Sequence, residues 1–261
     1  MKISFAGFGN MARAIAESLR NNNEWQLFAA APSLPDKANP KGITTHFSNS
    51  VIAEQADVVI IAVKPDKVRN VLIEIKPMLS KHCVVVSIAA GITLEKLADA
   101  CPSGQAIVRS MPNTPIAVSK GATALIANTF VSDEQISVVN QLFQCSGITA
   151  WVSEENDINA LTALSGSGPA YFFLFLEAMI AAARQLGIED SVATSFALQT
   201  MSGTSALLET TGLSPEHLRN KVTSPAGTTA AAIAILQNNE FEALISKAMH
   251  AAFTRAQELG N

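Results

Sequence analysis

The sequence predicts an α/β protein in which a doubly wound parallel sheet comes first and an all-helical region follows. Up to about residue 152, short apolar runs alternate with segments of helical periodicity, which is the pattern of parallel strands joined by crossover helices. Beyond that point only long helical periodicities follow. We therefore expect two domains, residues 1–152 and residues 153–261.

The first domain contains a series of candidate strands. They lie at residues 2–6, 25–31, 43–47, 57–63, 83–89 and 105–110. The run at 57–63 consists almost entirely of Val, Ile and Ala, as expected for a parallel strand that is buried on both faces. Helices are expected to begin near residues 10, 49, 65 and 93, so that each crossover returns the chain to the same edge of the sheet.

The second domain is expected to contain helices only. They are predicted at about 155–164, 168–186, 190–210, 214–221 and 226–259, the last with a break near Asn238-Asn239. These segments are rich in Ala, Ser, Thr and Gly, and the whole chain has only 15% charged residues where about 25% is typical. Small side chains and little charge predict helices that pack against a second copy of the chain.

Composition and charge argue against nucleic acid and metal as partners. The net charge is −4 and the basic residues are scattered singly, so we expect no basic face for phosphate backbones. The three cysteines have neither disulfide nor metal spacing, which favours a reducing compartment. We interpret the four histidines as surface or core residues, because none pairs with a serine, a cysteine or a carboxylate cluster and none has the spacing of metal ligands. They are His46, His82, His217 and His250.

A membrane span and a signal peptide are also not expected. The most apolar stretch, residues 172–183, carries Glu177 and is shorter than the roughly 20 residues that a span needs, so we expect a buried helix there. Near the start, Gly7, Gly9 and Asn10 interrupt the apolar run before it reaches the length of a signal sequence. The sequence therefore predicts a cytoplasmic protein.

A glycine motif follows the first predicted strand. Residues 7–12 read G-F-G-N-M-A, which fits the dinucleotide-binding pattern G-x-G-x-x-A between a strand and a helix. The first glycine makes the tight turn, the second lets a pyrophosphate approach the backbone, and the helix start supplies free N–H groups. The alternative is a glycine turn that binds nothing. The candidate cofactor residues here are Gly7, Phe8, Gly9, Asn10 and Met11.

The end of the second strand favours NADPH, with NADH as a weaker alternative. NAD-binding proteins usually place Asp or Glu about 20 residues past the glycines, to hold the ribose 2′-hydroxyl. Here residues 29–33 carry no carboxylate, and the first one is Asp36. Ser33, Lys37 and Asn49 could reach a 2′-phosphate, although no arginine is at hand.

Three polar turns are candidate parts of a site. Asn113 follows the last of these predicted strands, where an open sheet presents its ligand crevice, and it could hold a carboxamide. In the turn at 224–229, Ser224 is expected to cap a helix whose first residue is Pro225, so that hydroxyls and N–H groups could hold a carboxylate. The turn at 165–171 is the third. For each, a plain turn or a capped helix start is the alternative.

Four motifs in this order resemble the pyrroline-5-carboxylate reductase family over essentially the whole chain. They are A-V-K-P at 62–65, R-S-M-P-N-T-P at 109–115, L-S-G-S-G-P-A-Y at 164–171 and V-T-S-P-A-G-T-T at 222–229. The resemblance implies a Rossmann-type domain, a helical dimerisation domain, and an NAD(P)H-dependent reduction of a cyclic imine to L-proline. It also implies a homodimer, and larger assemblies such as decamers made of five dimers.

The resemblance also assigns residues. The substrate carboxylate is held by the turn that matches Val222, Ser224, Ala226, Gly227, Thr228 and Thr229. Thr229 is the candidate catalytic residue beside the ring nitrogen. Further cofactor contacts carry over to Asn49, Ala62, Val63, Lys64 and Pro65. The family commonly has two glycines after Ser-Pro where this chain has Ala-Gly, and we expect alanine to fit a helical turn there.

Two rival functions are weighed against the reductase. A β-hydroxyacid dehydrogenase has a similar two-domain plan but needs a catalytic lysine on its first long helix, and residues 171–183 contain none. A non-catalytic NADP-binding protein would keep the glycine turn and the dimer, but it has no need of a hydroxyl-rich turn that holds a carboxylate.

Overall fold

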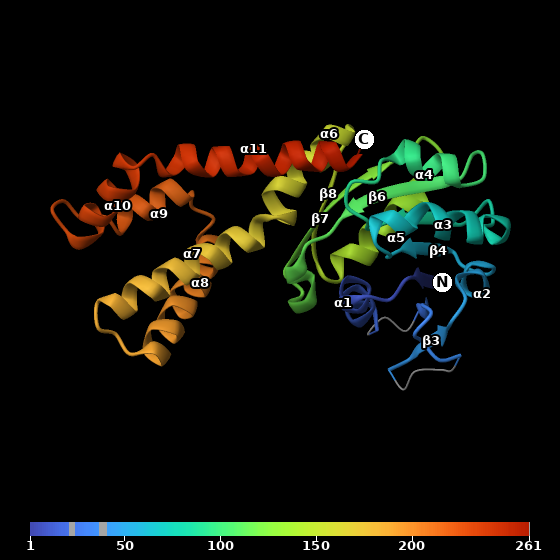
Figure 1. The fold of residues 1–261 in the computed structure, drawn as a ribbon, viewed down its shortest axis with the longest axis horizontal. Helices are drawn as coiled ribbons and strands as arrows, with labels where there is room; N and C mark the ends of the chain where they lie inside the picture. Colours follow the sequence, from blue (N-terminus) through green and yellow to red (C-terminus); the bar gives the residue numbers. More distant parts are fainter. Residues whose placement is uncertain (21–23, 37–40, 261) are drawn as a thin grey trace. The chain divides into compact units, whose positions relative to one another are not determined.

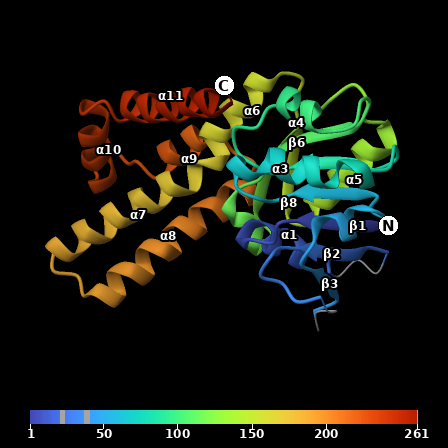
Figure 2. The same ribbon diagram turned by 45° about the vertical axis from the view of Figure 1, so that its right-hand side comes forward.

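The computed structural model describes residues 1–20, 24–36 and 41–260. The chain forms two compact units, both visible in Figures 1 and 2. Unit 1 comprises residues 1–169 and 251–261, and unit 2 comprises residues 170–250. The boundary expected at 152/153 follows a different criterion, the change from strands to helices, and stays a prediction.

Unit 1 is built on one sheet in the order β3-β2-β1-β4-β5-β6-β7-β8. The strands are β1 (Lys2–Ala6), β2 (Gln26–Ala30), β3 (Ile43–His46), β4 (Val58–Ile61), β5 (Val84–Ser87), β6 (Ala106–Met111), β7 (Gly121–Ala127) and β8 (Gly147–Trp151). Neighbouring strands are parallel except β6 and β7. The order reverses between β1 and β4, which is where such sheets bind ligands. The predicted doubly wound sheet is confirmed.

Helices cover both faces of this sheet (Figure 1). They are α1 (Asn10–Leu19), α2 (Asn49–Ala53), α3 (Pro65–Ile75), α4 (Leu94–Ala100), α5 (Asp133–Gln144) and α6 (Glu155–Leu161), with short turns η1 (Lys76–Met78) and η2 (Thr114–Val118). Ile60 packs in a core with residues of α1 and α5, while its neighbour Ile61 packs with residues of α3 and α4. Successive strand residues therefore point into opposite cores, and both are fully buried.

Three elements after residue 110 were absent from the sequence prediction. They are β7, α5 and β8. Helix α5 begins with a capping box, in which Ser132 accepts from the Gln135 N–H and the Gln135 side chain accepts from the Ser132 N–H. This S-x-x-Q signal is visible in the sequence. Strand β8 lies at the edge of the sheet and is only partly buried, so its hydrophobic pattern is weak.

The helices of the second half match the prediction closely. After the π-helix η3 (Thr162–Gly166) come α7 (Gly168–Gln185), α8 (Asp190–Thr211), α9 (Pro215–Lys221), α10 (Thr228–Asn238) and α11 (Phe241–Gly260). The predicted break near Asn238-Asn239 separates α10 from α11. Helix α7 starts and α11 ends among residues assigned to unit 1.

Unit 2 has almost no interior of its own. Among its residues only Leu176 and Ala193 are buried in the single chain. Phe172 is 65% exposed and Leu174 is 67% exposed. The expectation that residues 172–183 form a buried helix is therefore wrong for one chain, because its helices do not enclose a core. Low charge and many exposed apolar side chains are typical of a surface that is buried against another protein chain.

One helical run in the described residues, Glu155–Gln185, is long and apolar enough to cross a membrane, with a mean hydropathy of 1.3 over an 18-residue window. This is weak evidence, because it rests on length and composition only. A helix that packs against a second protein chain can meet the same criterion. The expected absence of a membrane partner stays a prediction.

Candidate active site

The glycine motif forms the turn between β1 and α1. Gly7 has a φ of +90°, and a Cβ placed on it would lie 2.6 Å from Cγ1 of Val63 and 2.7 Å from the carbonyl oxygen of Ala62. Only glycine fits such a conformation and such an approach. The turn after β1 and the segment after β4 are therefore in contact, and two of the predicted cofactor segments lie side by side.

The start of α1 is open to a ligand. Gly9 is the N-cap, no side chain caps the helix, and its first turn contains no acidic residue. A Cβ on Gly9 would meet no atom within 4 Å. The first N–H groups of a helix have no partner within the helix, so this start fits a pyrophosphate. Asn10 and Met11 occupy its first positions.

Phe8 is fixed by its surroundings. Its ring is buried, the guanidinium of Arg13 lies 5.0 Å from the ring centroid, and Nε of Arg13 donates to the Phe8 carbonyl at 3.2 Å. These contacts hold the turn between its two glycines. Arg13 was not singled out from the sequence, and its place one helical turn into α1 is the signal that could have indicated it.

The segment 62–65 leads from β4 into α3 at the same edge. The N–H of Ala62 donates to the carbonyl of Ala6 at 2.8 Å, so the segment begins beside the glycine turn. Lys64 is the N-cap of α3 and Pro65 its first residue. As predicted, proline opens this helix.

The residues expected at the adenosine end of the cofactor site lie on separate elements. Ser33 lies exposed in the turn after β2. Asn49 begins α2, and its amide donates to Glu74 at 3.0 Å. The residue Lys37 lies outside the described residues. Asp36 pairs with Nδ1 of His46. The sequence did not indicate this contact, because β3 brings together two residues that are 10 apart in sequence.

Asn113 is held on two sides. Its amide nitrogen donates to the carbonyl of Ser165 at 3.0 Å, and its amide oxygen accepts from the N–H of Ala122 at 2.9 Å. Among the described residues, the second N–H of the Asn113 amide has no hydrogen-bond partner. The bond to Ser165 joins the motifs 109–115 and 164–171. A Cβ on Gly166 would lie 3.0 Å from Cε of Met111, so the π-helix packs tightly against the same strand end.

Arg109 makes a third contact between these motifs. Its side chain is only 4% exposed and pairs with Glu155 on α6, and it donates to Asn159 at 3.1 Å. The other carboxylate oxygen of Glu155 accepts from the Leu94 N–H at 2.6 Å. The motif at 109–115, which contains Asn113, is thus fastened to α6 by a buried ion pair. A polar pocket of about 420 Å³ adjoins this pair.

The hydroxyl-rich turn precedes α10 in unit 2. Helix α10 begins at Thr228 with Gly227 as N-cap, and no side chain caps it. In the described residues the hydroxyls of Ser224, Thr228 and Thr229 form no hydrogen bond. A Cβ on Gly227 would lie 2.6 Å from Oγ of Ser224. The turn therefore packs closely and leaves its donors free for a ligand.

The expected capping of this turn is wrong. Ser224 and Pro225 lie before the helix in a turn closed by the Gly227 N–H, which donates to the Ser224 carbonyl at 3.1 Å. Ala226 has a φ of +58°, so it is left-handed where a helical turn was expected. Glycine adopts this conformation without strain and alanine does not, which gives a physical reason for the glycine that the family pattern commonly has there.

The chain matches models of known families in both of its halves. Residues 155–259 match the model described as pyrroline-5-carboxylate reductase dimerisation, and residues 2–91 match the model described as NADP oxidoreductase, coenzyme F420-dependent. A pyrroline-5-carboxylate reductase of Pseudomonas aeruginosa is 40% identical over 99% of this chain and 96% of that protein. The chain belongs to the pyrroline-5-carboxylate reductase family.

Solved structures agree with this membership. A pyrroline-5-carboxylate reductase from Coxiella burnetii has a TM-score of 0.92 and 39% identity, covering 99% of this chain and 98% of that one. A pyrroline carboxylate reductase of Plasmodium falciparum with NADP bound has a TM-score of 0.90 and 32% identity, covering 100% and 98%. The family resemblance deduced from the motifs is confirmed, and the dimerisation match supports self-association.

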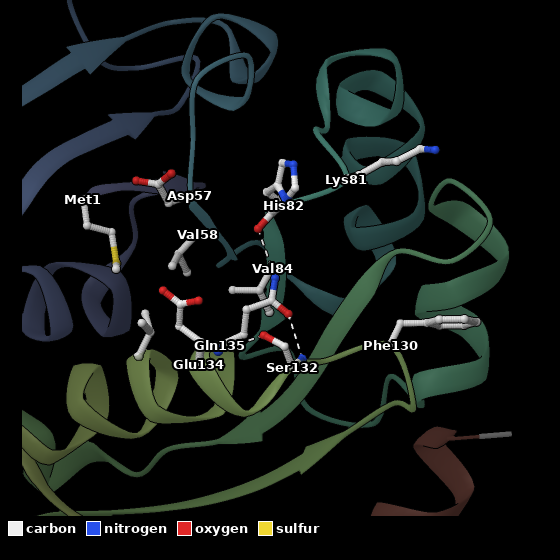
Figure 3. A pocket seen from close by; sticks show the side chains of 11 residues that line it. Met1, Asp57, Val58, Lys81, His82, Val84, Phe130, Ser132, Glu134 and Gln135 are labelled. Atoms are coloured by element: carbon white, nitrogen blue, oxygen red, sulfur yellow. Dashed lines mark hydrogen bonds between the residues drawn. The ribbon is translucent and has the colours of Figure 1, made fainter.

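A pocket of about 680 Å³ lies away from the edge where this family's glycine turn is found. Figure 3 shows the Glu134 carboxylate directed toward the space and Lys81 extending away from it, while the Asp57 carboxylate accepts from the Lys2 N–H at 2.7 Å. Asp57 precedes β4 and His82 precedes β5, so the pocket adjoins the amino ends of the strands. Dinucleotides bind at the carboxyl ends, and we assign this pocket no part in the reductase site.

The cysteines are not candidate nucleophiles. Burial raises the pKa of Cys83 to about 12 and that of Cys101 to about 11. Burial also raises the pKa of Cys145. All three thiols therefore stay protonated at neutral pH, and the thiolate is the reactive form.

Proposed function

We propose that this protein reduces the cyclic imine 1-pyrroline-5-carboxylate to L-proline with NADPH as the hydride donor, the last step of proline synthesis. Full-length membership in the pyrroline-5-carboxylate reductase family carries the proposal. Two uncapped helix starts behind glycines agree with it, one in unit 1 and one in unit 2. Each suits an anion, and the reaction brings two: a dinucleotide pyrophosphate and a substrate carboxylate.

The dinucleotide is assigned to the carboxyl edge of the sheet. Gly7 to Met11 would receive the pyrophosphate, and Ser33 and Asn49 the adenosine ribose. The segment Ala62, Val63, Lys64 and Pro65 would line the path toward the nicotinamide. Asn113 would offer its remaining amide N–H to the nicotinamide carboxamide. The open space at Gly9 fits the pyrophosphate, and residues 30–35 add no negative charge beside the ribose.

The substrate is assigned to the turn before α10. The Ser224 hydroxyl and the N–H groups of Thr228 and Thr229 would hold the carboxylate, with Val222, Ala226 and Gly227 shaping the turn. Hydrogen bonds to a charged acceptor contribute about 1.5–3 kcal/mol each. No basic residue is then needed in the turn, which agrees with the sequence of residues 222–229.

Thr229 is the proposed catalytic residue. The bound dinucleotide supplies the hydride for the carbon of the C=N bond. The protein aligns donor and acceptor, for which a separation of about 3–3.5 Å is effective. A protonated imine is already a good hydride acceptor, so a hydroxyl that bonds the ring nitrogen and orients its proton is sufficient. Residues 222–229 contain no acid, base or histidine, in keeping with this modest demand.

The assembly and its location complete the proposal. We propose a homodimer formed through the helices of residues 155–259, with decamers of five dimers as a further state. The proposed location is the cytoplasm, with no nucleic-acid, membrane or metal partner. A stable and active monomer in light scattering at micromolar concentration would contradict the dimer.

The decisive assay follows NADPH absorbance with 1-pyrroline-5-carboxylate. We expect imine-dependent oxidation with kcat/KM higher for NADPH than for NADH. Binding of NADPH without any imine-dependent oxidation would instead indicate the non-catalytic NADP-binding protein. A preference for NADH would show that the end of β2 has been misinterpreted.

Thr229→Ala tests the catalytic assignment. If the hydroxyl bonds the ring nitrogen mainly in the transition state, kcat and kcat/KM should fall together, by roughly ten- to a hundredfold for about 1.5–3 kcal/mol. Thr229→Ser keeps the hydroxyl and should retain most activity. The dissociation constant of NADPH should stay the same in both variants. Near-normal kcat/KM in the alanine variant would reduce Thr229 to a helix-start residue.

A further inference from the structure

The turn after β2 lies beside the glycine turn. The N–H of Gly7 donates to the carbonyl of Ala30, the last residue of β2, at 2.8 Å. A dinucleotide whose pyrophosphate lies on α1 must therefore extend its adenosine ribose over the end of β2. Asp36 is the first carboxylate of the turn that follows, in the region where such folds choose between a 2′-hydroxyl and a 2′-phosphate.

This turn is fastened to the end of β3. The N–H of Ala31 donates to the carbonyl of His46 at 3.2 Å, and Oγ1 of Thr45 donates to the carbonyl of Pro35 at 2.7 Å. The carboxylate of Asp36 pairs with Nδ1 of His46, the last residue of β3. The His46 side chain is 23% exposed and that of Asp36 is 54% exposed, so the histidine is the better anchored partner.

We propose that His46 is a specificity-determining residue for the cofactor: it holds the Asp36 carboxylate against β3 and so keeps it from the adenosine ribose. A free carboxylate at the end of β2 accepts hydrogen bonds from ribose hydroxyls and repels a 2′-phosphate. A carboxylate paired with an imidazole accepts fewer hydrogen bonds from the ribose and repels a 2′-phosphate less. The inference rests on the proposed function, because it presupposes a dinucleotide on α1.

Another acidic group near this turn, Glu74, does not differ between the variants that are compared. Glu74 on α3 reaches this edge through its bond from Asn49. Ser33 is uncharged. Among the described residues of the turn at 31–36, Asp36 is the acidic group whose position can change the potential at the ribose, and Nδ1 of His46 contacts its carboxylate.

The test compares His46→Val, Asp36→Asn and the double variant. Valine suits a strand and removes the partner of Asp36. We expect the ratio of the NADH to the NADPH dissociation constant, measured by fluorescence titration, to fall about two- to fivefold in His46→Val, the size of an exposed charge interaction. Asp36→Asn alone should change the ratio little, and the double variant should restore it.

His82→Val is the matched control, because His82 adjoins the amino ends of the strands and should leave the ratio unchanged. His46→Thr, which also suits a strand, carries the same expectation as His46→Val if the valine variant does not fold. An unchanged ratio in the His46 variants, or a double variant that keeps the lowered ratio, would overturn the inference.

These titrations contain no imine, so they separate the inference from the proposed function. If both dinucleotides bind and the ratios behave as expected while no imine is reduced, the reductase proposal fails and the inference stands. If the wild-type protein reduces the imine and the ratio of the two dissociation constants is unchanged in the His46 variants, only the inference about His46 fails. A chain that binds neither dinucleotide overturns both.

Discussion

The two compact units use apolar residues in opposite ways. In unit 1, Ile3, Phe5 and Ile60 are fully buried between the sheet and its helices. In unit 2, Phe172 is 65% and Phe196 is 71% exposed. Unit 1 therefore has a complete hydrophobic core within one chain. Many of the apolar side chains of unit 2 stay exposed in one chain and need a second protein surface to bury them. The match of residues 155–259 to a dimerisation family model independently supports burial of these side chains by a second copy of the chain.

The units resemble each other in how they prepare a binding site. Helices α1 and α10 start behind Gly9 and Gly227, and no side chain caps either start. By contrast, Ser132 caps α5 and Ser214 caps α9. When no side chain caps the start of a helix, its first N–H groups can donate hydrogen bonds to a ligand. Both units thus give up local stability at the place assigned to an anion.

The largest expected effect tests the contrast in burial. Phe196→Glu would place an unpaired carboxylate in the interface expected for unit 2, at a cost of several kcal/mol per buried charge. We expect the dimer dissociation constant, measured by analytical ultracentrifugation, to rise more than about a hundredfold, together with a loss of helicity in unit 2.

Ile148→Glu provides the matched control for this substitution. Ile148 lies on the edge strand β8 of unit 1 and is 72% exposed, against 71% for Phe196. The same change at the same exposure should leave the association state unaltered there. Equal effects at both positions would remove the distinction between the two units.

The second effect concerns the buried ion pair of unit 1. Glu155→Gln leaves the Arg109 guanidinium, whose side chain is 4% exposed, without a charged partner. Breaking a buried pair costs about 3–5 kcal/mol, and we expect the lower end because Glu155 is one-third exposed. Urea unfolding measures the loss. The neighbouring exposed Glu154→Gln should stay within about 0.5 kcal/mol of wild type.

The sheet was predictable up to β6 because most of its strands are short apolar runs, such as VVII in β4 and VVVS in β5, which suit burial on both faces. Beyond it, β7 contains Gly and Thr and pairs antiparallel with β6, and the edge strand β8 alternates between half-buried and exposed residues with none fully buried. Helical periodicity gave the helices of unit 2, but not their exposure. The pattern of apolar residues shows which side chains must be buried. It does not show whether the same chain or a second chain buries them.

The third effect separates two glycines of one motif. Gly7→Ala forces alanine to a φ of +90° with its Cβ 2.7 Å from the Ala62 carbonyl oxygen, so we expect a loss of more than about 1 kcal/mol in stability and weak NADPH binding. Gly9 has a φ of −79° and open space around its Cβ position. Gly9→Ala should leave the thermal midpoint unchanged or slightly raised.

Gly9→Ala should nevertheless weaken NADPH binding, because its methyl group occupies the path by which the pyrophosphate approaches the backbone. Thermal unfolding and NADPH titration of the two variants separate the roles. A Gly9→Ala variant that binds NADPH normally would show that the open space is not used, and a stable Gly7→Ala variant would contradict the geometry of the turn.

The candidate site was predictable as a set of motifs but not in its details. Contacts between residues far apart in sequence, such as Arg109 with Glu155, leave no local pattern and were not foreseen. The pairing of Asp36 with His46 depends on the register of β2 and β3. The conformation of Ala226 was misjudged because Pro225 at a helix start was the more familiar pattern, whereas the helix begins at Thr228.

The smallest effect concerns this alanine. Ala226→Gly removes the strain of a non-glycine residue at a φ of +58°, which is worth about 1–2 kcal/mol, but it adds about 0.4–1 kcal/mol of chain entropy to the unfolded state. We therefore expect a net gain of about 0.5–1 kcal/mol in the free energy of unfolding. Gly212→Ala is the reverse change in unit 2, at a φ of +63° with no atom within 4 Å of the added Cβ. It should lose stability by a similar amount. If Ala226→Gly destabilises the chain while Gly212→Ala behaves as expected, the left-handed turn is not the conformation that residues 224–227 adopt, and the placement of the free hydroxyls before α10 would have to be redrawn.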